Sequence, residues 1–215
     1  MATSARSFIL LNLFICAILS GCHLFDRDKD FDYGRVEQSV YKNDFFGVSV
    51  RLPERWQVQT KAQLDSIRMG KPRAATRNEG IKASEINSAT VLTVYKFKSD
   101  TFFDFNPTVS IFIEQIGPRS GTRSANDYLL NAGKMLKRSP MHYEVTDSIT
   151  KEVIGGQLFY RLHAQIENNR FGISQDYFST MLNGFSFNFI LTSSNDDDWQ
   201  QLRQIISTAN FSAKE

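Results

Sequence analysis

Residues that carry covalent or metal chemistry are scarce in this chain. It has two cysteines in 215 residues, Cys16 and Cys22, and both lie at the N-terminus. The remainder can therefore form no internal disulfide and offers neither a cysteine nucleophile nor a cysteine-ligated metal site. The three histidines are His23, His142 and His163, and no His-x-x-x-His or paired-carboxylate spacing indicates zinc ligands. We expect no metal and no cofactor.

An excess of charge of either sign is also missing. Lys and Arg number 25 and Asp and Glu number 23, which gives a formal net charge of +2. Proteins that bind nucleic acid usually carry a basic excess that neutralises phosphates. We therefore expect no nucleic-acid partner. The length suits one globular domain that buries a core without disulfide staples.

No apolar run is long enough to be a good membrane span. The longest covers residues 8–19, about a dozen positions, whereas a helix needs about 20 residues to cross a bilayer. Arg6 precedes the run, and the small residues Ser20 and Gly21 follow it. This order of charged, apolar and small residues is typical of a secretory signal peptide, here residues 1–21.

The end of this segment carries a more specific motif. Leu19, Ser20, Gly21 and Cys22 resemble the bacterial lipobox. That resemblance implies that Cys22 receives a diacylglycerol and an N-acyl chain, which together hold a protein stably at a membrane. An ordinary signal peptide that happens to end near a cysteine is the alternative. His23 stands where inner-membrane lipoproteins usually have an aspartate, so we expect the outer membrane, facing the periplasm, in a host with two membranes.

Residues 22–38 separate this anchor from the domain that we expect over 39–215. Charges of both signs crowd together there, and the few aromatic residues show no sustained period. The segment is interpreted as the lipidated cysteine and a flexible tether. A first amphipathic turn that packs on the domain is the alternative, and the sequence does not decide between them.

Strand and helix signals alternate in the first half of the domain. Val48, Val50 and Leu52 alternate with polar residues, which predicts a half-buried strand that Pro53 ends. Ser124 is an N-cap candidate ahead of an apolar helical stripe. The other expected elements are a short helix at 61–69, a surface loop at 70–84, strands at 89–97 and 107–116, and a helix at 124–137.

The second half predicts a meander of antiparallel strands. Asn183 and Gly184 supply the pair of positive φ angles that a two-residue hairpin turn requires. Asn195 or Asp196 caps a last helix, in which apolar residues recur at helical spacing from Trp199. The expected strands are 143–154, 157–167, 172–182 and the segment after Gly184. Such a pattern indicates an α+β domain with helices packed on an antiparallel sheet.

The order of these elements resembles a known family. Residues 41–58, "YKNDFFGVSVRLPERWQV", are similar to the N-terminal signature of the PsbP-like family, which includes bacterial lipoproteins of the DcrB type. The later helix, the strand with "IGG", the aromatic strand pair joined by Asn-Gly and the last helix match as well, over about 39–213. The resemblance implies a sheet of about six antiparallel strands flanked by helices on both faces. It also implies binding or accessory roles, with no catalytic residues to carry over.

A polar patch is the first candidate site. If residues 168–171 form the loop of a hairpin, His163 lies directly opposite Asp176, and Arg161 shares that face. The patch is either an ordinary polar sheet surface with a hydrogen bond under a helix, or a ligand or hydrolytic site.

Two further surface hypotheses concern apolar and basic residues. Three phenylalanines between the strands at 89–97 and 107–116 form either an exposed apolar patch or a cap on the core; they are Phe102, Phe103 and Phe105. A basic loop either contacts anionic lipid headgroups or is simply solvated; it contains Lys71, Arg73, Arg77 and Lys82.

These observations favour a non-enzymatic lipoprotein of the cell envelope. It would be attached to the membrane through Cys22 and would bind a protein partner in the envelope. The alternative is a domain that holds a small or apolar ligand between sheet and helix. A hydrolase built on His163 and Asp176 is a third hypothesis.

Overall fold

The computed structural model describes residues 29–61, 63, 81–98, 104–167 and 172–212. The expected signal peptide and the lipidation site Cys22 lie outside these residues. So do most of the helix predicted at 61–69, most of the loop predicted at 70–84, and two of the three phenylalanines, Phe102 and Phe103.

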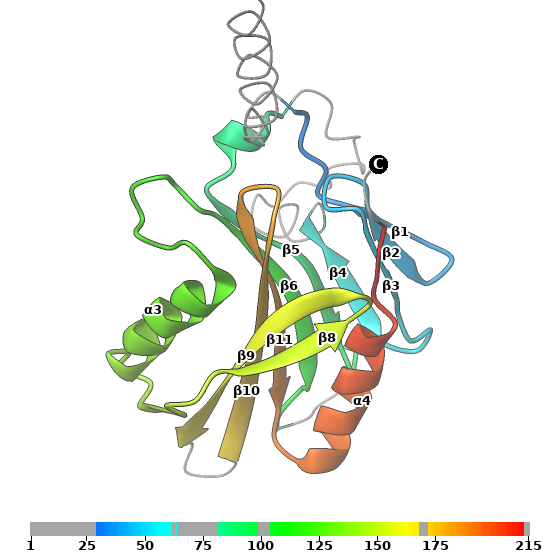
Figure 1. Cartoon of the computed structure of the whole chain (residues 1–215). Coiled ribbons are helices and arrows are strands. Elements are labelled where there is room, and N and C mark those ends of the chain that lie inside the picture. Colours follow the sequence, from blue (N-terminus) through cyan, green and yellow to red (C-terminus); the bar gives the residue numbers. More distant parts are fainter. Residues whose placement is uncertain (1–28, 62, 64–80, 99–103, 168–171, 213–215) are drawn as a thin grey trace, which may run out of the picture.

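A large antiparallel sheet dominates the described part of the chain (Figure 1). Its strands follow the order β4-β5-β6-β11-β10-β9-β7, and β8 also pairs with β9. The sheet has eight strands rather than the predicted number of about six. The strands are β4 (Gln57–Thr60), β5 (Ser88–Tyr95), β6 (Thr108–Gln115), β7 (Tyr143–Val145), β8 (Thr150–Ile154), β9 (Gln157–Glu167), β10 (Gly172–Leu182) and β11 (Phe185–Ser193).

The single strand predicted at 143–154 is in fact two strands. β9 is long enough for both to pair along the same edge, β8 with its first half and β7 with its second half. The α+β class and the antiparallel pairing are as predicted, and the difference in strand number comes partly from this division.

A second, smaller sheet was not predicted. It has the order β1-β2-β3-β12, in which β12 near the C-terminus pairs with β3 near the N-terminus. The strands are β1 (Arg35–Glu37), β2 (Val40–Asn43), β3 (Val48–Arg51) and β12 (Asn210–Phe211).

The domain begins earlier than residue 39. Phe31 is 2% exposed and contacts the rings of Phe45 and Phe185, and β1 pairs with β2. The last part of the predicted tether 22–38 therefore belongs to the fold, because Phe31 is buried in the core and Tyr33 packs against it. Of the two alternatives for this segment, packing on the domain holds from Phe31 onward.

The two helices for which a cap was predicted begin where that cap was expected. Ser124 accepts a hydrogen bond from the backbone of Asp127 at 3.1 Å, and Asn195 accepts one from the backbone of Asp198 at 2.8 Å. Each bond satisfies an amide that the first turn of a helix leaves without a partner. In the described part of the chain, no helix combines the length and apolarity needed to cross a membrane. The helices are α3 (Ala125–Lys137) and α4 (Asp196–Ser207), and a 3-10 turn covers Ala83–Glu85.

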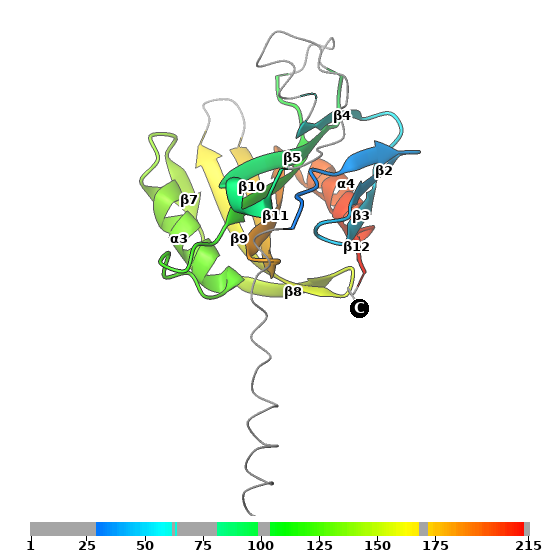
Figure 2. The same ribbon diagram turned by 90° about the horizontal axis from the view of Figure 1, so that it is seen from above.

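Alternate residues of β9 and β10 face different helices. Leu162 is buried against Gly133 of α3, whereas Asp176 bonds to Trp199 of α4. Figure 2 shows α3 beside β7 at one side of the molecule and α4 beside β3 and β12 at the other. Because successive side chains of a strand point to opposite faces of the sheet, adjacent residues of β9 and β10 pack against different helices.

Phenylalanines fill the core between the large sheet, α4 and the small sheet. Three of them occupy alternate positions of β11 and are fully buried, namely Phe185, Phe187 and Phe189. Their rings contact other rings at tilted or edge-to-face angles, for example Phe187 and Phe189 at 86°. Burial of each ring contributes about 1.5–3 kcal/mol. Trp56 is partly buried and packs against this core.

Two hairpin turns depend on residues that tolerate positive φ. Asn183 and Gly184 have φ angles of 49° and 79°, as the Asn-Gly pair predicted. Gly155 and Gly156 join β8 to β9 with φ angles of 57° and 82°. Gly155 also lies against the backbone of Ala209, next to β12. This turn therefore packs against the chain just before β12.

We predict that Gly155→Ala destabilises the protein far more than Gly156→Ala. Both substitutions place a side chain at positive φ, which is unfavourable by about 1–2 kcal/mol. A Cβ at position 155 would also lie 2.2 Å from the carbonyl oxygen of Ala209, whereas a Cβ at 156 meets nothing within 4 Å. The clash adds roughly 1–3 kcal/mol to the loss of unfolding free energy in urea. Equal losses for the two variants would contradict this packing.

Candidate functional site

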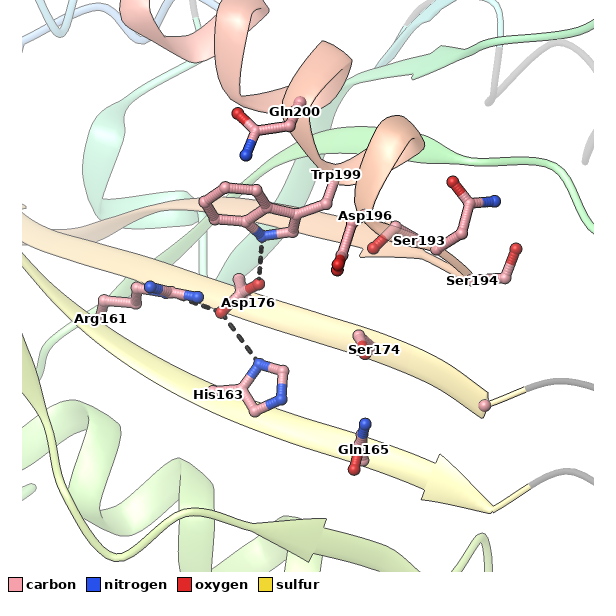
Figure 3. Close-up of a pocket in the computed structure, with 12 residues that line it drawn as sticks. Arg161, His163, Gln165, Ser174, Asp176, Ser193, Ser194, Asp196, Trp199 and Gln200 are labelled. Carbon is pink, nitrogen blue, oxygen red and sulfur yellow. Dashed lines mark hydrogen bonds and ion pairs between the residues drawn. The ribbon is translucent and has the colours of Figure 1, made fainter.

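The carboxylate of Asp176 is buried and accepts three hydrogen bonds. Its side chain is 1% exposed. Oδ1 accepts from Arg161 Nε at 2.7 Å and from His163 Nδ1 at 3.1 Å, and Oδ2 accepts from Trp199 Nε1 at 2.6 Å. Both carboxylate oxygens are thus occupied, and one side chain joins β9, β10 and α4 (Figure 3). Donors of this kind offset the desolvation of a buried charge.

The ring of His163 has a defined orientation. A carboxylate can only accept, so Nδ1 carries the proton in this hydrogen bond. In the neutral ring the other nitrogen, Nε2, is therefore an acceptor. Figure 3 shows it on the side of the ring away from Asp176, toward Gln165.

The guanidinium of Arg161 is held by rings as well as by charge. It lies 5.3 Å from the ring of Trp199 and 5.6 Å from that of Phe178. Arg203, one helical turn after Trp199, approaches the same two rings and forms an ion pair with Glu152 of β8. Cation–π contacts and ion pairs together restrict both arginines.

A pocket of about 490 Å³ opens beside this cluster. Its floor is formed by the ends of β9 and β10, and its wall by the start of α4 and the segment before it. Most of the lining side chains are amides, hydroxyls or charged groups. They are Arg161, His163, Gln165, Ser174, Asp176, Ser193, Ser194, Asn195, Asp196, Trp199 and Gln200, with Gly172 at the edge.

The structure brings together the residues of the predicted polar patch. His163 and Asp176 are direct cross-strand partners, and Arg161 bonds to the same carboxylate. Trp199 was assigned only to the apolar stripe of the last helix. The sequence did carry a signal for its role in the site, because the indole N–H of a buried tryptophan usually finds a hydrogen-bond acceptor.

The other two surface hypotheses involve residues that are only partly described. Phe105 is half-buried, while Phe102 and Phe103 lie outside the described residues. In the basic loop, Lys82 forms an ion pair with Asp30 at 2.8 Å. The other three members lie outside the described residues; they are Lys71, Arg73 and Arg77.

The arrangement at Asp176 resembles part of a catalytic triad without a nucleophile in contact. Hydrolysis by such a group requires a nucleophile within hydrogen-bond reach of the histidine. Ser174 lies two residues before Asp176 on the same face, yet in the part of the chain that the structure describes His163 forms its side-chain hydrogen bond with Asp176 alone. Among the described residues, no group of three or more His, Cys, Asp or Glu could hold a metal ion.

A second polar cluster lies under α3 on the other side of the sheet. Tyr128 donates to Glu114 at 3.0 Å, and burial raises the pKa of Tyr128 to about 12. Asn188 donates to the backbone of Phe112 at 3.1 Å and to the hydroxyl of Ser186 at 3.1 Å. These contacts link α3 to β6 and β11, and we assign the cluster a structural role.

No family model and no curated protein matches this chain. Solved structures do show similarity. The protein LpqN, described as involved in cell envelope biogenesis of Mycobacterium tuberculosis, has 13% identity and a TM-score of 0.44, with 76% of this chain and 82% of that chain covered. The cyanobacterial PsbP (CyanoP) from Synechocystis has 15% identity and a TM-score of 0.48, with 83% and 96% covered.

A protein from Bacteroides thetaiotaomicron has 11% identity and a TM-score of 0.44, with 78% of this chain and 46% of that chain covered. A PsbP protein is thus among the structures to which this chain is similar. At these identities and TM-scores, the likeness carries no conclusion about activity, ligand or partner.

We predict that Asp176→Ala lowers the free energy of unfolding by about 3–5 kcal/mol, because three buried or half-buried donors lose their acceptor. The matched control is Asp196→Ala. Asp196 is an exposed carboxylate of the same pocket, and its loss changes stability by less than about 1 kcal/mol. Urea unfolding of both variants measures the difference. Similar small losses for both would contradict the role assigned to Asp176.

Proposed function

We propose that this protein is a lipid-anchored, non-enzymatic domain of the cell envelope that binds a small polar ligand in the pocket between β9, β10 and α4. The observation that carries the proposal is the buried Asp176, which fixes Arg161, His163 and Trp199 at the pocket wall. Side chains held in this way lose little conformational entropy when a ligand binds.

The anchor is proposed from the motif that ends at Cys22. Attachment there would hold the pocket close to a membrane surface, on a short connection to the first buried residue, Phe31. In a host with two membranes we propose the outer membrane, facing the periplasm. The envelope protein partner that the family resemblance implies stays a second proposal, and it rests on that resemblance alone.

The chemistry of the pocket separates the two kinds of small ligand considered from the sequence. An apolar ligand between sheet and helix requires walls of aliphatic and aromatic side chains. The pocket walls here carry mainly amides and hydroxyls, and the phenylalanines of this face are packed into the core. We therefore propose a polar ligand in place of an apolar one.

Native mass spectrometry of the full-length protein, purified in mild detergent from its own membranes, tests both parts of the proposal. We predict a mature chain that begins at lipidated Cys22 and carries a small molecule released by collisional activation. An unmodified N-terminus would contradict the anchor, and a wild-type protein free of any small molecule would contradict the binding function.

Two substitutions on one helix locate the bound molecule. Gln200 and Gln204 are both exposed on α4, one turn apart, and of these two Gln200 lines the pocket. Gln200→Trp should obstruct the pocket and remove the molecule while keeping the lipid. Gln204→Trp should keep both. Equal retention of the molecule by the two variants would place it elsewhere.

A further inference from the structure

Among the described residues, the charged side chains that line the pocket are already paired, with one exception. Arg161 is paired with Asp176 at 2.7 Å. Behind the pocket wall, Lys96 is paired with Asp198 at 2.6 Å. These cations are thus neutralised by the protein, and a bound anion would have to compete with a carboxylate already in place.

Asp196 is the exception at the rim of the pocket. It is exposed in the first turn of α4, and no ion pair joins it to another of the described residues. Its charge, with that of its neighbour Asp197, opposes the attraction of an anion to the start of the helix. An anionic ligand would therefore be repelled at the entrance.

A cationic ligand meets the opposite obstacle inside. Asp176 is 1% exposed and already accepts three hydrogen bonds from protein donors, so this carboxylate is poorly placed to pair with a ligand cation. The guanidinium of Arg161 lies at the pocket wall and against the ring of Trp199. A second cation would lie beside it in a partly dehydrated site, where like charges repel strongly.

The remaining lining groups suit hydroxyls. Gln165 and Gln200 each present a donor and an acceptor, and Ser174 and Ser194 do the same with one hydroxyl each. Nε2 of His163 adds an acceptor when the ring is neutral. A ligand whose hydroxyl groups both donate and accept can satisfy all of these groups at once.

We infer that the pocket takes an uncharged, hydroxyl-rich ligand, of which a neutral sugar unit is the chemical class. This inference rests on the proposed function and adds the ligand class to it. The volume of about 490 Å³ is within the range of small-molecule sites. For a domain held at the envelope, such a ligand would be a unit of an envelope glycan or a free sugar.

Calorimetric titration of the full-length lipidated protein in detergent tests the ligand class with three probes of similar shape. These are glucose, which is neutral, glucosamine, which is cationic, and glucuronate, which is anionic. We expect glucose to bind about tenfold more tightly than either charged sugar. Maltose is a second neutral probe, and it distinguishes the two sources of the ligand. If the pocket takes a unit of a glycan, maltose should bind as tightly as glucose or more tightly. If the pocket takes a free monosaccharide, maltose should bind more weakly than glucose.

Variants at the pocket locate the binding. The double variant Gln165→Ala/Gln200→Ala should weaken glucose binding about tenfold, since two hydrogen bonds are lost. The control Gln204→Ala should leave it unchanged. The fluorescence of Trp199, isolated by Trp56→Phe because the chain has two tryptophans, should change during the titration.

Tighter binding of a charged sugar would overturn the inference on ligand class and leave the proposed binding function standing. Absence of binding by glucose and maltose would also overturn it. Native mass spectrometry of the full-length protein then shows separately whether the pocket binds any small molecule.

Discussion

The buried carboxylate of Asp176 is the interaction on which the pocket depends. It lies on the face of the sheet that also carries the phenylalanine core, where an unpaired charge would be strongly unfavourable. Three donors offset this by approaching from β9 and from α4. The same contacts therefore stabilise the charge, position α4 over the sheet and hold His163 and Trp199 beside the pocket.

This arrangement interrupts an otherwise apolar face. Further along β10, Phe178 packs into the core. On β11, Leu191 is paired with Asp176 and Phe189 is paired with Phe178, and both are buried. A residue such as Leu at position 176 would continue the core without any need for donors. Replacing buried ion pairs with apolar residues is often neutral or stabilising. A buried charge at one position of a phenylalanine-rich face is the kind of local exception that functional sites show.

Local signals in the sequence were sufficient for the hairpins and helices. The Asn183–Gly184 turn, the Ser124 cap and the register of the hairpin formed by β9 and β10 each depend on residues close together in the chain. The register of that hairpin placed His163 opposite Asp176, so half of the site could be predicted from residue counting. The alternation of strand and helix signals was also sufficient for the α+β class, whereas the number of about six strands implied by the PsbP-like resemblance was too low for the eight-stranded sheet.

Features that depend on distant contacts could not be predicted in the same way. The pairing of β12 with β3 joins the two ends of the domain, and Phe31 enters the core from a segment that is otherwise charged. Trp199 shares its helical stripe with Leu202, so periodicity alone assigned it to the core. The hydrogen bond from its indole to Asp176 follows only once α4 is placed on the sheet.

Hydrogen exchange of the two indole N–H groups, followed by NMR, tests the role of Asp176 most directly. In the described residues the indole of Trp199 donates to a buried carboxylate at 2.6 Å, and no hydrogen bond is formed by the indole of Trp56. We predict that the Trp199 signal persists in D₂O after the Trp56 signal has exchanged, and that Asp176→Ala abolishes this protection. Rapid exchange of both signals in the unsubstituted protein would contradict it.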